Sequence, residues 1–333
     1  MKTGRTAILI AMPLALLYAS LFVGRFAVPP LEVGRILLAH LAGLPHTWPD
    51  SLETIVVQIR LPRAVMALFL GAGLSASGAA YQGMFRNPLV SPDILGVTAA
   101  SGFGAAVALL LSSGALELQV ISFAFGLLGV LLTYLIARVY RTTPVLMLVL
   151  SGIVVAAFFS ALLSAVKYIA DPESKLPAIT YWLLGSLNAV STRSLAMALP
   201  PILIGGTGLM LLRYRLNVLA MGEEDARALG VRTERVKGAI IVCTTLITAA
   251  AVSVCGIVGW VGLVIPHLCR MIVGPDHRVL IPAAISVGAT YLLLIDDVSR
   301  TATAGEIPLG ILTAIIGAPV FAYLLRKTRG SWQ

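Results

Sequence analysis

Uncharged apolar runs recur along this chain of 333 residues, and they constrain its fold more than any other feature. Each run is long enough to cross a hydrocarbon layer of about 30 Å as a helix, and the runs are continuous rather than alternating between polar and apolar residues. The clearest of them cover residues 7–23, 64–80, 118–137, 144–166, 238–258 and 307–325. Only 12% of the residues are charged, whereas soluble domains carry about 25%. The sequence therefore predicts an all-α polytopic membrane protein.

Hydropathy supports about eight to ten spans, and no linker divides residues 1–333 into separate domains. Two segments, about 24–59 and 167–193, are expected as loops on the same side of the membrane. Within the second, residues 179–185 are apolar and aromatic but too short to span, so we expect a re-entrant or interfacial helix there. Residues 259–273 are expected to form an unusually short span.

The net charge of +9 does not indicate a nucleic-acid partner, because most basic residues fall on one side once the spans are placed. We place the N-terminus in the cytoplasm, so that Lys2, Arg141 and Arg329 are all cytoplasmic. The lysines and arginines that then lie outside are Arg25, Arg35, Arg60, Arg63, Lys167, Lys175, Arg193 and Arg300. This asymmetry follows the positive-inside rule and predicts that both termini are cytoplasmic.

Paired arginines stand at the mouth of the second span, in the sequence Arg60-Leu61-Pro62-Arg63. A guanidinium beside hydrocarbon is expensive, so arginines at such a place serve a partner, a lipid head group or a ligand. Arg300 lies at the outer end of the ninth span, three residues after Asp297, and the two side chains are close enough in sequence to pair.

A hydrophilic segment at about 220–231 is the other polar feature inside the chain. Its residues are Ala220, Met221, Gly222, Glu223, Glu224, Asp225, Ala226, Arg227, Ala228, Leu229, Gly230 and Val231. Three acids in the first turn and a glycine at the end are typical of a capped helix. The spacing leaves two interpretations open, an ordinary connector and a helix that docks onto a soluble partner.

Several chemistries find no support in the residues. His267 and Cys269 do not share a helix face and have no third ligand nearby in sequence, so we predict no metal site. No nucleophile and base pair up inside the spans, and we assign no catalytic residues. There is no phosphate-binding G-x-x-x-x-G-K-[ST] loop. The spans also lack central ionisable residues, which disfavours a coupled secondary carrier. The small residues of 71–79 predict tight helix packing.

Ordered motifs along nearly the whole chain resemble those of a known family. They are RLPR (60–63), RNPLVSPDILG (86–96), YWLLGSL (181–187), GEEDARALGV (222–231), GIVGWVGLVIPHLCR (256–270), DHRVLIP (276–282) and EIPLGILTAIIGAPVF (306–321). With them the chain resembles the FecCD-type permeases of ATP-binding-cassette (ABC) importers, which serve cobalamin, ferric siderophores, haem and related metal chelates.

The resemblance implies the type II importer permease fold, with about ten transmembrane helices, in the cytoplasmic (inner) membrane of a prokaryote. It implies three partners: a second copy of the chain, two ATPase subunits on the cytoplasmic side, and a substrate-binding protein outside. This chain is then not an enzyme and binds no cofactor, since ATP and magnesium belong to the ATPase.

The resemblance also assigns roles to particular positions. Arg60, Arg63 and Arg300 match positions that receive acidic residues of the binding protein. The segment 220–231 matches the coupling segment that sits in a cleft of the ATPase. The residues that match the cytoplasmic gate are Asn87, Pro88 and Leu89, with Thr142 and Thr143 at the start of the fifth span.

The sequence does not single out a cargo. An iron complex, as ferric siderophore or haem, is favoured by family frequency alone. Cobalamin and an oxyanion such as molybdate fit the same machinery.

Overall fold

The structure is a computed structural model that describes residues 3–43, 48–138 and 142–327. The described residues form helices and connecting segments, without a β-strand. The elements are α1 (Thr3–Phe22), α2 (Pro30–Ala42), α3 (Asp50–Glu53), the π-helix η1 (Thr54–Arg60), α4 (Leu61–Met84), the 3-10 helix η2 (Pro92–Leu95), α5 (Val97–Leu110), α6 (Ala115–Ala137), α7 (Val145–Ile169), α8 (Lys175–Leu183), α9 (Thr192–Met221), α10 (Glu223–Ala228), α11 (Thr233–Cys255), α12 (Val261–Val273), α13 (His277–Thr301) and α14 (Leu309–Lys327).

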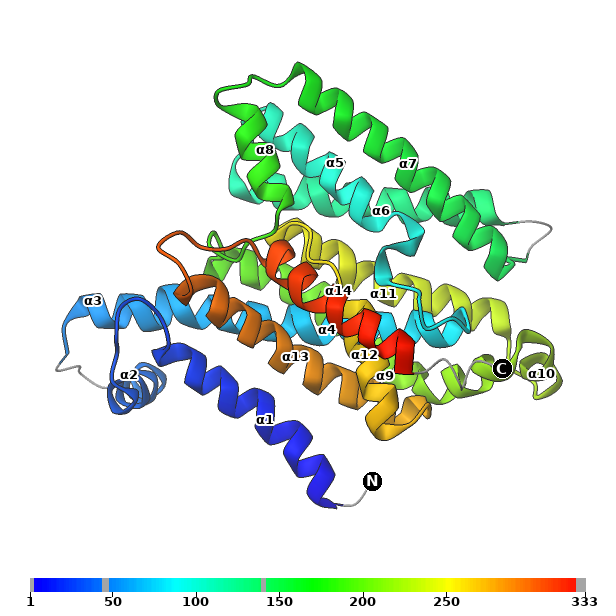
Figure 1. The fold of residues 1–333 in the computed structure, drawn as a ribbon, viewed down its shortest axis with the longest axis horizontal. Coiled ribbons are helices and arrows are strands. Elements are labelled where there is room, and N and C mark those ends of the chain that lie inside the picture. The colour runs from blue at the N-terminus through cyan, green and yellow to red at the C-terminus, as the bar shows by residue number, and fades with distance from the viewer. Residues whose placement is uncertain (1–2, 44–47, 139–141, 328–333) are drawn as a thin grey trace.

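The long helices run roughly side by side, with α2 and α3 at one end of the bundle and α10 at the other (Figure 1). Helices long and apolar enough to cross a membrane cover Asp50–Met84, Ala115–Ala137, Val145–Ile169, Thr192–Met221, Thr233–Cys255 and His277–Thr301. Shorter apolar helices cover Ala11–Phe22, Val97–Leu110, Val261–Val273 and Leu309–Leu324. Every predicted span therefore coincides with an apolar helix, including the short one at 259–273.

The expected loop at 24–59 is largely helical, which corrects the prediction from the sequence. Pro30 starts α2, as its fixed φ favours, and Gly43 ends α2 in the left-handed conformation. From Asp50 onward the helix continues through η1 into α4. Residues 44–47 of this predicted loop lie outside the described residues, as do Lys2, Arg141 and Arg329.

Two other boundaries also move. The short helix expected at 179–185 is α8, which begins four residues earlier, at Lys175. The helix expected at 220–231 is only six residues long, because α9 continues to Met221 and Gly222, with a φ of 137°, interrupts the helix. The Gly222 conformation favours a residue without a Cβ, so the break between α9 and α10 is set by this glycine.

Helix α4 lies at the centre of the bundle and packs against α13, α12, α11 and α9. Its glycines make this possible on several faces. A Cβ at Gly71 would overlap the carbonyl oxygen of Gly288 in α13, and a Cβ at Gly78 would overlap that of Gly262 in α12. A Cβ at Gly73 would lie 2.6 Å from the side chain of Ile247 in α11. The tight packing predicted from the small residues of α4 is confirmed.

Candidate functional site

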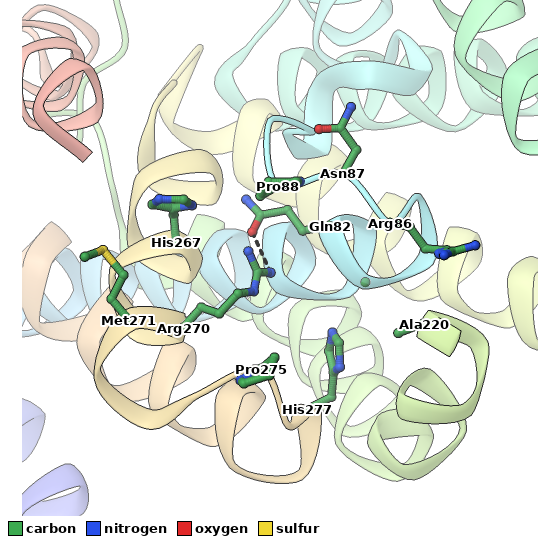
Figure 2. A pocket seen from close by; sticks show the side chains of 11 residues that line it. Gln82, Arg86, Asn87, Pro88, Ala220, His267, Arg270, Met271, Pro275 and His277 are labelled. Carbon is green, nitrogen blue, oxygen red and sulfur yellow. Dashed lines mark hydrogen bonds between the residues drawn. The ribbon is translucent and has the colours of Figure 1, made fainter. Parts of the chain in front are cut away.

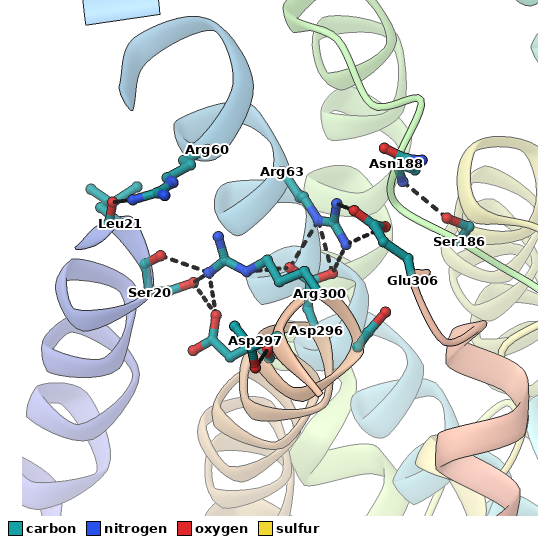
Figure 3. Close-up of polar contacts among 12 residues, drawn as sticks. Ser20, Leu21, Arg60, Arg63, Ser186, Asn188, Asp296, Asp297, Arg300 and Glu306 are labelled. Carbon is teal, nitrogen blue, oxygen red and sulfur yellow. Dashed lines mark hydrogen bonds and ion pairs between the residues drawn. The ribbon is translucent and has the colours of Figure 1, made fainter. Parts of the chain in front are cut away.

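Three arginines gather at the end of the bundle that carries α2 and α3 (Figure 3). Arg60 ends η1, Arg63 lies in the first turn of α4, and Arg300 lies in the last turn of α13. We call them, with their side-chain partners, the arginine cluster. Its members are Ser20, Arg60, Arg63, Asp296, Asp297, Arg300 and Glu306. The sequence predicts surface arginines, but the three are only 5%, 6% and 7% exposed.

Arg63 is held between two carboxylates. Its Nη2 and Nε lie 2.9 and 3.0 Å from Oδ1 of Asp296, whose side chain is fully buried. Its Nη1 and Nη2 lie 2.9 and 3.1 Å from the two carboxylate oxygens of Glu306. Because Glu306 stands just before α14 and is partly exposed, Arg63 joins α4, α13 and the segment that leads into α14.

Arg300 pairs with Asp297, one helical turn earlier, which confirms the pairing that the sequence suggested. Its Nη2 also donates to the carbonyl oxygen and hydroxyl of Ser20 in α1, both at 2.6 Å. The Ser20 hydroxyl in turn donates to Asp297 at 2.7 Å. These bonds fasten α1 to the end of α13.

The Arg60 guanidinium donates its hydrogen bonds to backbone carbonyls rather than to carboxylates. Its Nη1 donates to the carbonyl oxygen of Leu21 at 2.9 Å, and its Nη2 donates to that of Phe26. A Cβ at Gly24 would lie 2.7 Å from this guanidinium, so the turn after α1 has room for Arg60 only with glycine there. Within the described part of the chain, no carboxylate forms an ion pair with Arg60.

In sum the cluster contains three cations and three carboxylates, all contributed by one chain. Removing one member of a buried ion pair costs about 3–5 kcal/mol, because the partner's charge is left behind. The role of Glu306 was missed from the sequence. A signal existed, since Glu306 is the sole acid after residue 300 and immediately precedes the last span. The pairing of Asp296 with Arg63 could not be predicted either, because contacts between distant helices leave no trace in spacing.

At the opposite end, the predicted coupling segment forms a small projection around α10 (Figure 1). Ala220 and Met221 end α9, and Gly230 adopts the left-handed cap that the sequence predicts, at a φ of 80°. The buried side chain of Ala226 anchors α10. The side chains of Met221 and Leu229 are 58% and 63% exposed, so this projection presents apolar surface beside its acids.

Lys237 in the first turns of α11 connects this projection to the start of α7. Its Nζ donates to the carbonyl oxygen of Thr143 at 2.7 Å and pairs with Glu223 at 2.9 Å and Glu234 at 2.7 Å. Glu234 also accepts from the backbone N–H and hydroxyl of Thr143, at 3.0 and 2.5 Å. The Lys237 side chain is 1% exposed. We call Thr143, Glu223, Glu234 and Lys237 the lysine group.

The two predicted parts of the gate are thus placed differently. Thr143 belongs to the lysine group, where it bonds to Glu234. Thr142 precedes it in the connection between α6 and α7. Asn87–Leu89 follow the end of α4, where the Asn87 N–H donates to the Gln82 carbonyl at 3.1 Å. The Asn87 side chain accepts from the Leu89 N–H at 2.9 Å, which holds a tight turn. Leu89 is half exposed.

A cleft opens beside this turn, between the end of α4, α12 and the start of α13 (Figure 2). Asn87 and Pro88 form part of its wall, together with Arg270 and Ala220. The Arg270 Nη2 donates to the Gln82 side-chain oxygen across the cleft at 3.0 Å. The contact between Arg270 and Gln82 was not predicted from the sequence.

The number and length of the apolar helices define a multi-pass membrane protein. The sequence profile of the FecCD transport family matches residues 10–327, and the chain belongs to that family.

Sequence relatives and a solved structure support the same family assignment. The chain is 40% identical to a molybdate import system permease of Haemophilus influenzae, over 93% of this chain and 91% of that protein. It is 41% identical to a cobalamin import system permease of Halobacterium salinarum, over 92% and 84%. A metal-chelate type ABC transporter in an inward-facing conformation superposes with a TM-score of 0.86 at 38% identity, covering 97% of this chain and 99% of that one. The protein is therefore a permease subunit of an ABC importer, with the permease fold of that class.

Proposed function

We propose that this permease works as a homodimer, with a substrate-binding protein at the arginine cluster and two ATPase subunits at α10. The arginine cluster then faces outside and α10 faces the cytoplasm, as the positive-inside rule predicts from the basic loops. One observation carries this proposal. Helix α4 begins in the arginine cluster and ends at Met84, just before Asn87–Leu89, so a single buried helix joins the outer docking site to the inner gate.

The cargo that we propose is a metal carried as a chelate or as an oxyanion. The named relatives import molybdate and cobalamin, and a further relative in Helicobacter pylori, 40% identical over 84% of this chain, is named for iron chelatin. A bound metal is what these cargoes share. An iron complex, as ferric siderophore or haem, is the first to test, with cobalamin and molybdate as the alternatives.

The coupling step runs through the lysine group. ATP binding closes the ATPase pair around α10, and Glu223 moves with α10. Because Lys237 bonds to both Glu223 and Thr143, the displacement reaches Thr143, which lies two residues before α7. The gate at Asn87–Leu89 and the outer mouth then open in turn. Each ligand has to favour one conformation over the other for the cycle to be driven.

Uptake by a strain that lacks this chain tests the proposal. Labelled ferric siderophore, haem, cobalamin and molybdate are offered to the deletion strain and to the strain carrying the wild-type gene. We expect the deletion to lose uptake of one metal-containing cargo, and the gene to restore it. Undiminished uptake of every cargo in the panel would contradict the proposed cargo class.

Docking at the arginine cluster gives a prediction about Glu306. An acidic side chain of the binding protein has to compete with Glu306 for Arg63, because Glu306 is the partly exposed partner and Asp296 is buried. We expect Glu306→Gln to strengthen binding of the binding protein severalfold, measured with the purified permease by surface plasmon resonance.

The matched control is Glu32→Gln, which removes an acid from α2 at the same end, where Glu32 pairs with exposed Arg35. A gain in both variants would indicate a general loss of repulsion. Unchanged or weaker binding of Glu306→Gln would argue against competition for Arg63. Replacing Arg60 and Arg63 by glutamate is a poorer test, since it would bury new carboxylates beside Asp296.

A further inference from the structure

The cleft beside the end of α4 has a volume of about 540 Å³ and carries an unusual set of side chains. Gln82, Arg86 and Asn87 come from the end of α4 and its turn, His267 and Arg270 from α12, and His277 from the start of α13. Figure 2 shows the Arg270 side chain between the two histidines, with its guanidinium at Gln82.

The charge of the lining is one-sided. It includes two guanidiniums and two imidazoles, and none of its residues is acidic. Arg270 has no ion pair within the described residues, and its hydrogen bond goes to the neutral Gln82 amide. Arg63, which is buried more deeply, has two carboxylates. The cation at Arg270 therefore lacks the counter-charge that an enclosed guanidinium ordinarily has.

His267 supplies a second, independent observation. It is 4% exposed, lines the cleft, and neither of its ring nitrogens has a hydrogen-bond partner. Both nitrogens are enclosed, and the ring lies edge-on to Phe321 of α14 with ring centroids 5.9 Å apart. Buried polar side chains are nearly always hydrogen-bonded, so an imidazole without a partner in the wall of a polar cleft indicates a missing acceptor. In its neutral form the imidazole still offers one N–H.

We propose that this cleft binds a doubly charged tetrahedral oxyanion. Arg270 supplies the charge and a planar pair of N–H donors that match two oxygens of such an anion, and His267 donates to a third when its ring turns towards the cleft. Arg86 at the rim adds a positive potential. The oxyanion can be a cargo on its way to the cytoplasm or cytosolic inorganic phosphate. The site itself does not depend on which cargo the importer carries.

Isothermal titration of the purified permease, alone and assembled with its ATPase, tests the site. Molybdate and inorganic phosphate are the probes, each at constant ionic strength. We expect saturable binding of at least one of them to both preparations. A preference of tenfold or more for molybdate assigns the site to cargo, whereas equal binding assigns it to phosphate. Absence of saturable binding to the wild-type permease would overturn the proposal.

Variants locate the binding. Arg270→Gln removes the charge, and we expect affinity to fall by about tenfold or more, as for other charge-assisted hydrogen bonds. Met271→Glu puts a carboxylate at the mouth of the cleft, where Met271 is 42% exposed and a polar side chain is tolerated. We expect it to abolish binding while the thermal unfolding midpoint stays within a few degrees of wild type.

The control is Arg278→Gln. Arg278 lies at the same end of the bundle but is exposed and already paired with Asp276, so its loss alters net charge without touching the cleft. If Arg278→Gln and Met271→Glu weakened oxyanion binding equally, the loss of affinity would be explained by net charge alone, and the proposed site would be overturned. Binding to the permease alone that disappears on assembly with the ATPase would also overturn it, and would assign Arg270 to an acidic residue of that subunit.

Discussion

Replacing Lys237 with methionine is expected to reduce ATP-driven uptake to background while leaving the arginine cluster intact. Methionine fills most of the volume of the lysine stem but removes the ammonium that holds Glu223 and Glu234 together, and leaves them only the more distant Arg227. Because the two carboxylates are 28% and 30% exposed, the cost is below the roughly 3–5 kcal/mol of a fully buried pair. We expect α10 to relieve that cost by moving away from α11 and Thr143, which separates the proposed coupling segment from the start of α7.

Uptake of the cargo by complemented cells, with ATPase activity of the purified complex, measures this effect. We expect ATP hydrolysis that is no longer stimulated by the binding protein. Arg278→Met serves as control, since it removes an exposed cation at the same end of the bundle. Normal uptake by Lys237→Met would show that α10 transmits its motion by another route.

Replacing Gly78 with valine is expected to prevent the permease from folding. Any Cβ at this position overlaps the backbone carbonyl of Gly262, and backbone cannot move aside as a flexible side chain can. Overpacking of a close-packed interior costs about 1–3 kcal/mol where side chains can adjust. We expect a larger loss here, because α12 would have to separate from α4 along its length.

The yield of folded protein and its thermal unfolding midpoint in detergent measure the effect. Gly206→Ala in α9 is the matched control, because a Cβ there meets no atom within 4 Å. Alanine favours a helix over glycine by about 1 kcal/mol. We therefore expect the Gly206→Ala midpoint to equal or exceed that of the wild type. A Gly78→Val permease that unfolds at the wild-type temperature would contradict the packing of α4 against α12.

The spans were predictable because each depends on local composition alone. Even the short α12 was delimited nearly correctly, since Gly259 and Gly274 flank an apolar run. The helical character of residues 24–59 was not predictable in the same way. Prolines are typical of loops, but Pro30 stands at the first position of a helix, where proline is also favoured.

In the functional clusters too, contacts between residues close in sequence could be predicted, and contacts between distant residues could not. Asp297 and Arg300 are one turn apart, so their pairing could be predicted from spacing. The contacts of Arg63 with Glu306, and of Lys237 with Thr143, join residues far apart in sequence. Nothing in a single sequence reports such contacts, because they depend on how α4, α7, α11 and α13 pack. For the same reason, the cleft around Arg270 became visible only in the folded chain.

The arginine cluster is neutral as a whole, yet its charge is unevenly distributed. Two carboxylates crowd Arg63, whereas Arg60 is surrounded by backbone carbonyls. The cluster therefore has a negative side towards α14 and a positive side towards the turn after α1. An acidic knob arriving from outside is drawn first to the positive side, before it competes with Glu306 for Arg63. This polarity gives the docking surface a direction, so a partner with one acid per lobe has a preferred orientation before any close contact forms.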